Sequence, residues 1–258
     1  MIDVLTDNLR VLAQGLLTTL AITALAFVSA VVLGTLVAMF RVSPVPPLRA
    51  VGTVYVELFR NIPLLSLLIL VAYGLPYAGV SLSLFTTAVV SLAMVSAAFA
   101  CETVRAGING VPIGQVEAAR ALGFTFTQSL RRVILPQALR TMVQPLVNIF
   151  IGVALGSSLA AAVSVGELTY QAQQVGNRTA ESMLLFVISA VVYIVIALLG
   201  GGVGSVLERR LAVQPLLLHY GTGWFVEHDG RGDRNGVSGQ RVRWRILLQS
   251  LDVVREDR

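Results

Sequence analysis

Five long apolar stretches dominate this sequence and leave few folds open to it. They lie at about residues 15–40, 62–80, 82–100, 142–165 and 183–207. An α-helix of about 20 residues crosses the roughly 30 Å of hydrocarbon in a bilayer. Lipid offers the backbone no hydrogen-bond partners, so a spanning segment satisfies its own N–H and C=O groups as a helix. The sequence therefore predicts an all-α membrane protein with about five transmembrane helices.

The composition agrees with a membrane protein and argues against several kinds of chemistry. Only 13% of the 258 residues are charged, whereas a soluble domain carries about 25%. All 19 basic residues are arginine, so the chain has no lysine for a phosphate-binding loop or a Schiff base. Cys101 is the single cysteine, and both histidines lie beyond residue 212. We therefore expect no metal site, no catalytic residues and no cofactor on this chain.

The arginines are unevenly distributed between the two sides of the predicted spans. Three follow the first stretch, five follow the third and two follow the fifth, whereas Arg10 and Arg178 are the arginines expected on the other side. Positive loops favour the cytoplasmic side, so we expect the N-terminus outside and the C-terminus inside. We therefore interpret the basic charge as a signal for the orientation of the chain in the membrane and not as a sign of nucleic-acid binding. Residues 1–14 become an extracytoplasmic segment, and residues 15–212 a transmembrane domain whose first stretch is a retained span and not a signal peptide.

One polar segment interrupts the apolar pattern, at residues 112–136. Pro112 suits the start of a helix, and Gly123 favours a break halfway along the segment. We predict a short cytosolic helix, a bend and a second helix that returns to the membrane through Arg131 and Arg132. Apolar residues at helical spacing predict one apolar edge, formed by Val116, Ala119, Leu122 and Phe126. The periodicity fits equally a helix that docks in a groove of another protein and an interfacial connector between two spans.

The residues of this segment resemble the EAA loop in permease subunits of ABC importers, most closely the polar amino acid branch. The loop reads Gly-Gln-x-Glu-Ala-Ala-Arg-x-Leu-Gly and is followed by Val-Ile-Leu-Pro-Gln-Ala. Four further segments are similar to that family: GLLTTLAITALAFVSAVVLGTLVA at 15–38, YVELFRNIPLL at 55–65, CETVRAGINGVPIGQVEAARALG at 101–123 and VGELTYQAQQV at 165–175. The run RVSPVPPLRAVGTVYVELFRNIPL resembles glutamate-type permeases of high-GC Gram-positive bacteria. The resemblance covers about residues 10–212.

This resemblance implies a permease subunit in a bacterial cytoplasmic membrane. It implies an ATP-driven, binding-protein-dependent importer of glutamate or another polar amino acid, and a chain that is not itself an enzyme. ATP and Mg would bind to a separate cytosolic ATPase dimer, which receives the coupling loop. The other implied partners are a second permease subunit, identical or different, and an extracytoplasmic solute-binding protein. The implied coupling residues are Gly114, Gln115, Glu117, Ala118, Ala119, Gly123 and Pro136.

Polar residues near or within the spans are the candidates for a substrate path, because lipid disfavours them unless they are paired or face water. These candidates are Glu57, Arg60, Asn61, Asn148, Ser157, Ser158 and Glu167. Their alternative roles are an orienting charge cluster at 57–61, packing hydrogen bonds at Asn148 and a solvated loop carboxylate at Glu167. Glu102 and Arg105 lie three residues apart on one helix face, which predicts a structural ion pair.

One motif departs from the family. Relatives usually carry Lys-Asp-Thr-Ser or a similar polar run where this chain has Leu155, Gly156, Ser157 and Ser158. Either the two hydroxyls suffice for a substrate site or the partner subunit holds it, and the identity of the amino acid stays open. The tail at 213–258 is charged and rich in glycine, which predicts cytosolic disorder with an amphipathic helix at 241–255.

Two other classes of protein fit an apolar chain of this length. The first is a secondary transporter or channel that works without ATP, and such carriers often show paired repeats with broken helices. We find no internal repeat in the sequence. The second is an intramembrane lipid-phosphate hydrolase, which needs a cluster of acids, histidines or metal ligands within its spans. The five stretches contain no histidine and no pair of carboxylates.

Overall fold

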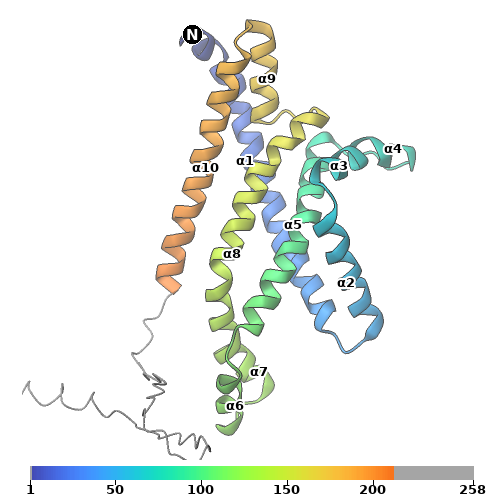
Figure 1. The fold of residues 1–258 in the computed structure, drawn as a ribbon, viewed down its shortest axis with the longest axis vertical. Helices are drawn as coiled ribbons and strands as arrows, with labels where there is room; N and C mark the ends of the chain where they lie inside the picture. Colours follow the sequence, from blue (N-terminus) through green and yellow to red (C-terminus); the bar gives the residue numbers. More distant parts are fainter. Residues whose placement is uncertain (1, 212–258) are drawn as a thin grey trace, which may run out of the picture. The chain divides into compact units, whose positions relative to one another are not determined.

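The computed structural model describes residues 2–211, which form helices joined by short turns (Figure 1). The membrane-length helices are α1 (Ile2–Val42), α5 (Leu84–Asn109), α8 (Leu135–Gly156) and α10 (Ser182–Leu211). The shorter elements are α2 (Pro46–Asn61), α3 (Leu64–Ile69), η1 (Leu70–Gly74), α4 (Leu75–Tyr77), α6 (Ile113–Ala121), α7 (Phe126–Ser129), η2 (Leu130–Ile134), η3 (Ser157–Val163) and α9 (Leu168–Thr179). No strand occurs among the described residues, which confirms the all-α prediction. The predicted tail, with its amphipathic helix, lies outside them.

Four helical segments of the described chain are long and apolar enough to cross a membrane. They are Val4–Val42, Leu84–Asn109, Phe126–Val163 and Ser182–Arg210. Pro46–Asn61 and Leu64–Tyr77 form a pair bent by 105°, and counting that pair as one broken span gives up to five.

The apolar stretch predicted as a span at 62–80 is therefore no candidate span by itself: its helical part, Leu64–Tyr77, meets the criteria for a span only together with α2, across the bend. Ile62 and Pro63 have extended backbone between the two helices. Proline restricts the residue before it to extended conformations, so the sequence Ile62-Pro63 ends α2 and redirects the chain.

The centre of the bundle is the contact between α1 and α5, which lie side by side (Figure 1). A Cβ atom at Gly34 would lie 2.6 Å from Ala100 Cβ and 2.7 Å from the carbonyl oxygen of Ala97. Such distances exclude any side chain at position 34. Buried small residues continue the contact along both helices: Ala26 and Ala30 on α1, and Ala97 and Ala98 on α5. Small residues allow two helix backbones to approach closely, which strengthens dispersion contacts in lipid.

The outer faces of the bundle are apolar instead of polar. On α10, Val187, Val191, Ile194 and Leu198 recur every three or four residues, and each is more than half exposed. A continuous apolar stripe of this kind is suited to contact with lipid tails.

Two π-helical segments interrupt the regular helices. η1 and η2 each end directly before a Leu-Pro pair, at Leu75–Pro76 and Leu135–Pro136. Proline has no N–H to donate within a helix, and its ring clashes with the preceding turn. The wider π turn accommodates both effects, and such bulges are frequent at functional sites. η2 lies where the polar segment rejoins the bundle.

Candidate functional site: an exposed loop and a charged cleft

The polar segment between α5 and α8 folds into two short helices with a turn between them. α6 ends at Ala121, and Gly123 has a φ of +77°, in the left-handed region that favours glycine. The amide N–H of Phe124 donates to the carbonyl of Ala119 across this turn, at 3.1 Å. α7 then begins with a capping box, in which the side chains and amides of Thr125 and Gln128 bond reciprocally. The predicted break at Gly123 is confirmed.

This loop lies at the end of the bundle opposite α9 (Figure 1). The exposed residues of α6 include four small or polar ones, Gly114, Gln115, Glu117 and Ala118, beside the exposed side chain of Ile113. Ala119 is buried on the opposite side of α6, 3% exposed, and holds the helix against the rest of the chain. Pro136 lies half-buried directly after η2, whose wider turn accommodates its missing N–H.

The predicted apolar edge through Val116, Ala119, Leu122 and Phe126 is wrong. Leu122 and Phe126 are 77% and 74% exposed, whereas Ala119 is buried. α6 ends at Ala121, so the last two residues leave the face on which Val116 and Ala119 lie. Helical spacing places residues on one face only while the helix continues.

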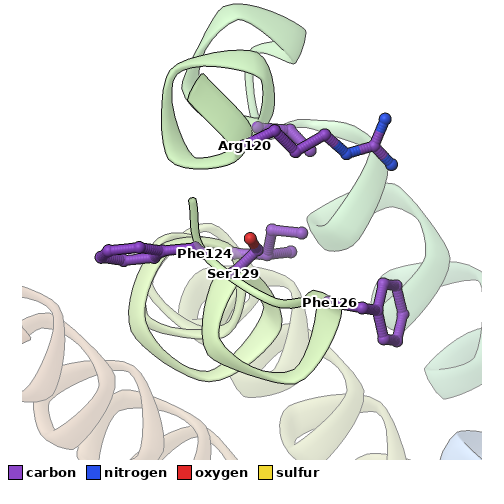
Figure 2. A pocket seen from close by; sticks show the side chains of 6 residues that line it. Arg120, Phe124, Phe126 and Ser129 are labelled. Carbon is purple, nitrogen blue, oxygen red and sulfur yellow. The ribbon is translucent and has the colours of Figure 1, made fainter. Parts of the chain in front are cut away.

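A small cavity separates the two helices of the loop (Figure 2). Its volume is about 100 Å³. Figure 2 shows the rings of Phe124 and Phe126 pointing in opposite directions, with Ser129 between them. The buried Ser129 hydroxyl has no hydrogen-bond partner in the described part of the chain. Ligand pockets of about 300–1,000 Å³ are usual for small molecules. The cavity is therefore a seam between α6 and α7 and not a substrate site.

A second hollow, between α1, α2 and α5, is larger and charged. Its volume is about 370 Å³. The lining consists of Arg41, Val56, Glu57, Arg60, Asn61, Phe99 and Glu102. The structure thus places three predicted path residues, Glu57, Arg60 and Asn61, in one cleft. Arg41 and Phe99 also line the cleft but were not predicted from the sequence. They lie on α1 and α5, far from residues 57–61 in the chain, and no local pattern connects them with those residues.

Glu102 is the centre of the charges beside this cleft. Its carboxylate accepts a hydrogen bond from the Arg41 guanidinium, and it lies 3.4 Å from Arg105 Nη1 and 3.9 Å from Arg60 Nη1. The spacing of Glu102 and Arg105 indicated their pairing, but Arg41 is the closer partner. The Arg60 guanidinium lies 5.7 Å from the centre of the Phe99 ring, within the range of a cation–π contact. Glu57 is exposed and makes no ion pair with any described residue.

The other predicted path residues lie apart from the cleft. Ser157 and Ser158 donate their hydroxyl hydrogens to the carbonyls of Ala154 and Leu155, each at 2.7 Å. Ser157 is fully buried, and Asn148 is exposed on α8.

Glu167 is fully buried, so the interpretation as a solvated loop carboxylate is wrong. It caps the N-terminus of α9, where it accepts hydrogen bonds from the amides of Thr169 at 2.9 Å and Tyr170 at 2.7 Å. The Tyr193 hydroxyl on α10 donates to the same carboxylate at 2.5 Å. Burial raises the pKa of Glu167, because it disfavours the charged form, although these three donors oppose the rise. The carboxylate thus joins α9 to α10.

Comparison with known proteins gives consistent matches over most of the chain. Residues 30–213 match the family described as binding-protein-dependent transport system inner membrane component. The probable glutamine ABC transporter permease protein GlnM of Bacillus subtilis (strain 168) is 38% identical over 211 residues, 81% of this chain and 97% of that protein. The L-cystine transport system permease protein TcyB of the same organism is 39% identical over 202 residues, 78% of this chain and 86% of that protein. A crystal structure of an amino acid ABC transporter with histidines matches with a TM-score of 0.76 at 34% identity, over 80% of this chain and 96% of that one.

Proposed function

The chain belongs to the family of inner membrane components of binding-protein-dependent transport systems, and from this premise we propose that it forms the amino acid path of an ATP-driven importer. It is a transport component and not an enzyme. The names of GlnM and TcyB refer to glutamine and cystine, both polar α-amino acids. We extend this class of substrate, glutamate included, to the present chain.

The exposed ridge of α6 carries the proposal that a separate ATPase drives transport. The ridge presents Gly114, Gln115, Glu117 and Ala118 at one end of the bundle, and small side chains leave a helix slim enough to enter a groove of another protein. α6 is connected to α5 on one side and to α8 on the other. A force applied to α6 would therefore act on two membrane-length helices at once. In this proposal ATP and Mg belong to the ATPase dimer.

The orientation and the remaining partners follow from the same assignment. The loop end carries Arg120, Arg131 and Arg132 and lies in the cytosol. The N-terminus and α9 then lie outside, where a solute-binding protein would deliver the amino acid. A second permease subunit, identical or different, would enclose the path together with this chain. The domain boundaries proposed are 1–14, 15–212 and 213–258.

We assign the substrate path to the charged cleft. An α-amino acid carries an ammonium and a carboxylate, and the cleft offers an unpaired carboxylate at Glu57 and a guanidinium at Arg60. The side-chain amide of Asn61 donates to the backbone carbonyl of Glu57 at 2.6 Å. Glu167 and Ser157 receive structural roles in this proposal because both are buried and hydrogen-bonded within the chain. Asn148 and Ser158 remain the candidates that are not fully enclosed.

The substitution Glu117→Lys tests the coupling assignment in the assembled transporter. Charge reversal on the exposed ridge of α6 is expected to lower ATPase co-purification and ATP-dependent uptake by at least about tenfold, equivalent to about 1.4 kcal/mol of binding. Glu208→Lys is the matched control, because Glu208 is also exposed but lies at the end of α10.

Unchanged co-purification and uptake in the Glu117→Lys transporter would contradict the coupling role. Uptake that continues at full rate with no ATPase subunit present would support the alternative of a secondary transporter or channel.

A further inference from the structure

One carboxylate connects three helices beside the cleft. Glu102 lies on α5, its hydrogen-bonded partner Arg41 is at the end of α1, and Arg60 is at the end of α2. The two interhelical contacts are unequal. The side chain of Arg41 is only 15% exposed and donates a hydrogen bond to Glu102, whereas the side chain of Arg60 is 47% exposed and lies 3.9 Å from Glu102, near the outer limit for an ion pair.

The three helices that carry these residues are also packed against each other to different degrees. α1 and α5 meet at Gly34, where the backbone of α5 leaves no room for a Cβ atom. They therefore behave as one packed unit, and the Arg41–Glu102 pair lies within it. Between α2 and α5, the Tyr55 hydroxyl donates to the Met94 carbonyl at 2.8 Å. Arg60 lies beyond Tyr55 along α2, and its contact with Glu102 is already long. A small movement of α5 would therefore break this contact before the others.

α5 also leads directly to the loop that we assign to the ATPase. Glu102 lies about two helical turns before α5 ends at Asn109. A short turn through Gly110 and Val111 then leads to Pro112, the cap of α6. A displacement of α6 is therefore transmitted along a short, continuous piece of backbone to the position of Glu102.

We propose that Glu102 is a positioning residue that couples the loop to the cleft, an inference that rests on the proposed function above. When α5 brings Glu102 towards Arg60, the guanidinium is paired and is lost to a substrate carboxylate. When α5 moves Glu102 away, Arg60 is free to bind that carboxylate. The ATPase thereby changes the affinity of the cleft, and by thermodynamic linkage the substrate changes the position of the loop.

The test compares Glu102→Gln, Glu102→Asp and Arg105→Gln in the complete transporter, reconstituted with its ATPase and binding protein. The probe is the best-transported member of a set of glutamine, glutamate and cystine. The measurements are KM, kcat and the number of amino acids taken up per ATP hydrolysed. In Glu102→Gln, Arg60 is free at every stage, so the substrate is bound more tightly and released more slowly. We expect KM, kcat and the ratio of uptake to hydrolysis all to fall, each by roughly fivefold or more.

Glu102→Asp separates coupling from a merely structural role. The shorter side chain keeps the charge beside Arg41, which preserves assembly, but it lies too far from Arg60 to pair with it. We expect the Glu102→Asp variant to assemble in normal amounts. We also expect it to show the same lowered KM and the same lowered ratio of uptake to ATP hydrolysis as the Glu102→Gln variant. Arg105→Gln is the matched control, since it removes a partner on α5 itself and leaves both interhelical contacts, and it is expected to keep wild-type values.

If Glu102→Asp keeps the wild-type KM and the wild-type ratio of uptake to ATP hydrolysis, the coupling role is overturned. This holds even if the Glu102→Gln variant fails to assemble. A second outcome would also overturn the coupling role: both variants give less assembled transporter, and the transporter that does assemble has an unchanged KM. A wild-type complex that shows no ATP-dependent uptake of any probe contradicts the proposed function itself, which distinguishes the two failures.

Discussion

Glu167 is a fully buried carboxylate that lacks a cationic partner within residues 2–211. Burial of a charge is costly unless hydrogen bonds replace its hydration. Here the amides of Thr169 and Tyr170, the positive end of α9 and the Tyr193 hydroxyl replace it. The amide of Leu168 also donates to Thr19 Oγ1 on α1, at 3.1 Å. The site therefore fixes the position of α9 relative to both α1 and α10.

The substitution Tyr193→Phe removes one donor from this carboxylate without changing the size of the ring. A hydrogen bond to a charged group contributes about 1.5–3 kcal/mol, and we expect the variant to lose about that much stability. Thermal unfolding of the purified chain in detergent measures the change. Tyr170→Phe is the control, because Tyr170 binds Glu167 through its backbone amide. Equal unfolding midpoints for the two variants would show that the Tyr193 hydroxyl is not needed at this site.

The contact between α1 and α5 depends on the absence of a side chain at Gly34. At Gly34 any Cβ atom would overlap Ala100, the Ala97 carbonyl and the Cys101 amide, which lies 2.9 Å from its position. Two of these three groups are backbone atoms, so they do not move aside by a change of rotamer. The pair is therefore the stiff part of the bundle, and α2 and the loop are attached to it.

The substitution Gly34→Val is expected to force α1 and α5 apart. Overpacking of a tight contact costs about 1–3 kcal/mol, so the unfolding midpoint and the yield of folded protein in detergent should both fall. Gly202→Val on α10 is the matched control, since a Cβ atom there has no neighbour within 4 Å. A Gly34→Val protein as stable as the Gly202→Val protein would contradict the close approach of the two helices.

At the scale of the whole described chain, apolar residues cover much of the outside of the helices, and two groups of charges stand at the cleft and at the loop between α5 and α8. In the proposed function, which follows from the family of binding-protein-dependent transport components, a separate ATPase subunit supplies the energy for uphill transport. Two parts of the described helices would serve this division of labour: the exposed residues of α6, which we propose as the docking surface, and the backbone of α5 that leads from α6 to the cleft.

Reconstitution in vesicles tests this division of labour. We expect the chain alone to accumulate no amino acid above the outside concentration, because no energy source acts on it. Addition of the ATPase, the second permease subunit, the binding protein and ATP is expected to produce accumulation, measured with labelled amino acid trapped in the vesicles. Vesicles with the ATPase but with ADP in place of ATP serve as the control. Accumulation by the chain alone would exclude the importer scheme.

Several features follow from local sequence. The apolar stretches predict the membrane-length helices because a helix in lipid depends mainly on the hydropathy of its own residues. Gly123 predicts the break after α6, since the left-handed turn there needs a residue without a side chain. The three-residue spacing of Glu102 and Arg105 likewise places them on one helix face, whatever surrounds that helix.

Other features were decided only by the packing of distant segments. Arg41 and Glu102 are 61 residues apart in the chain, so their contact exists only once α1 and α5 have met. Glu167 and Tyr193 are joined across 26 residues, and the burial of Glu167 depends on how α9 packs beside α10. Local hydropathy describes how a segment interacts with lipid, whereas burial and long-range ion pairing describe how segments interact with each other. The sequence therefore predicted the membrane-length helices and several polar residues of the cleft, whereas only the packing of α1, α2 and α5 brought those residues together with Arg41 and Phe99.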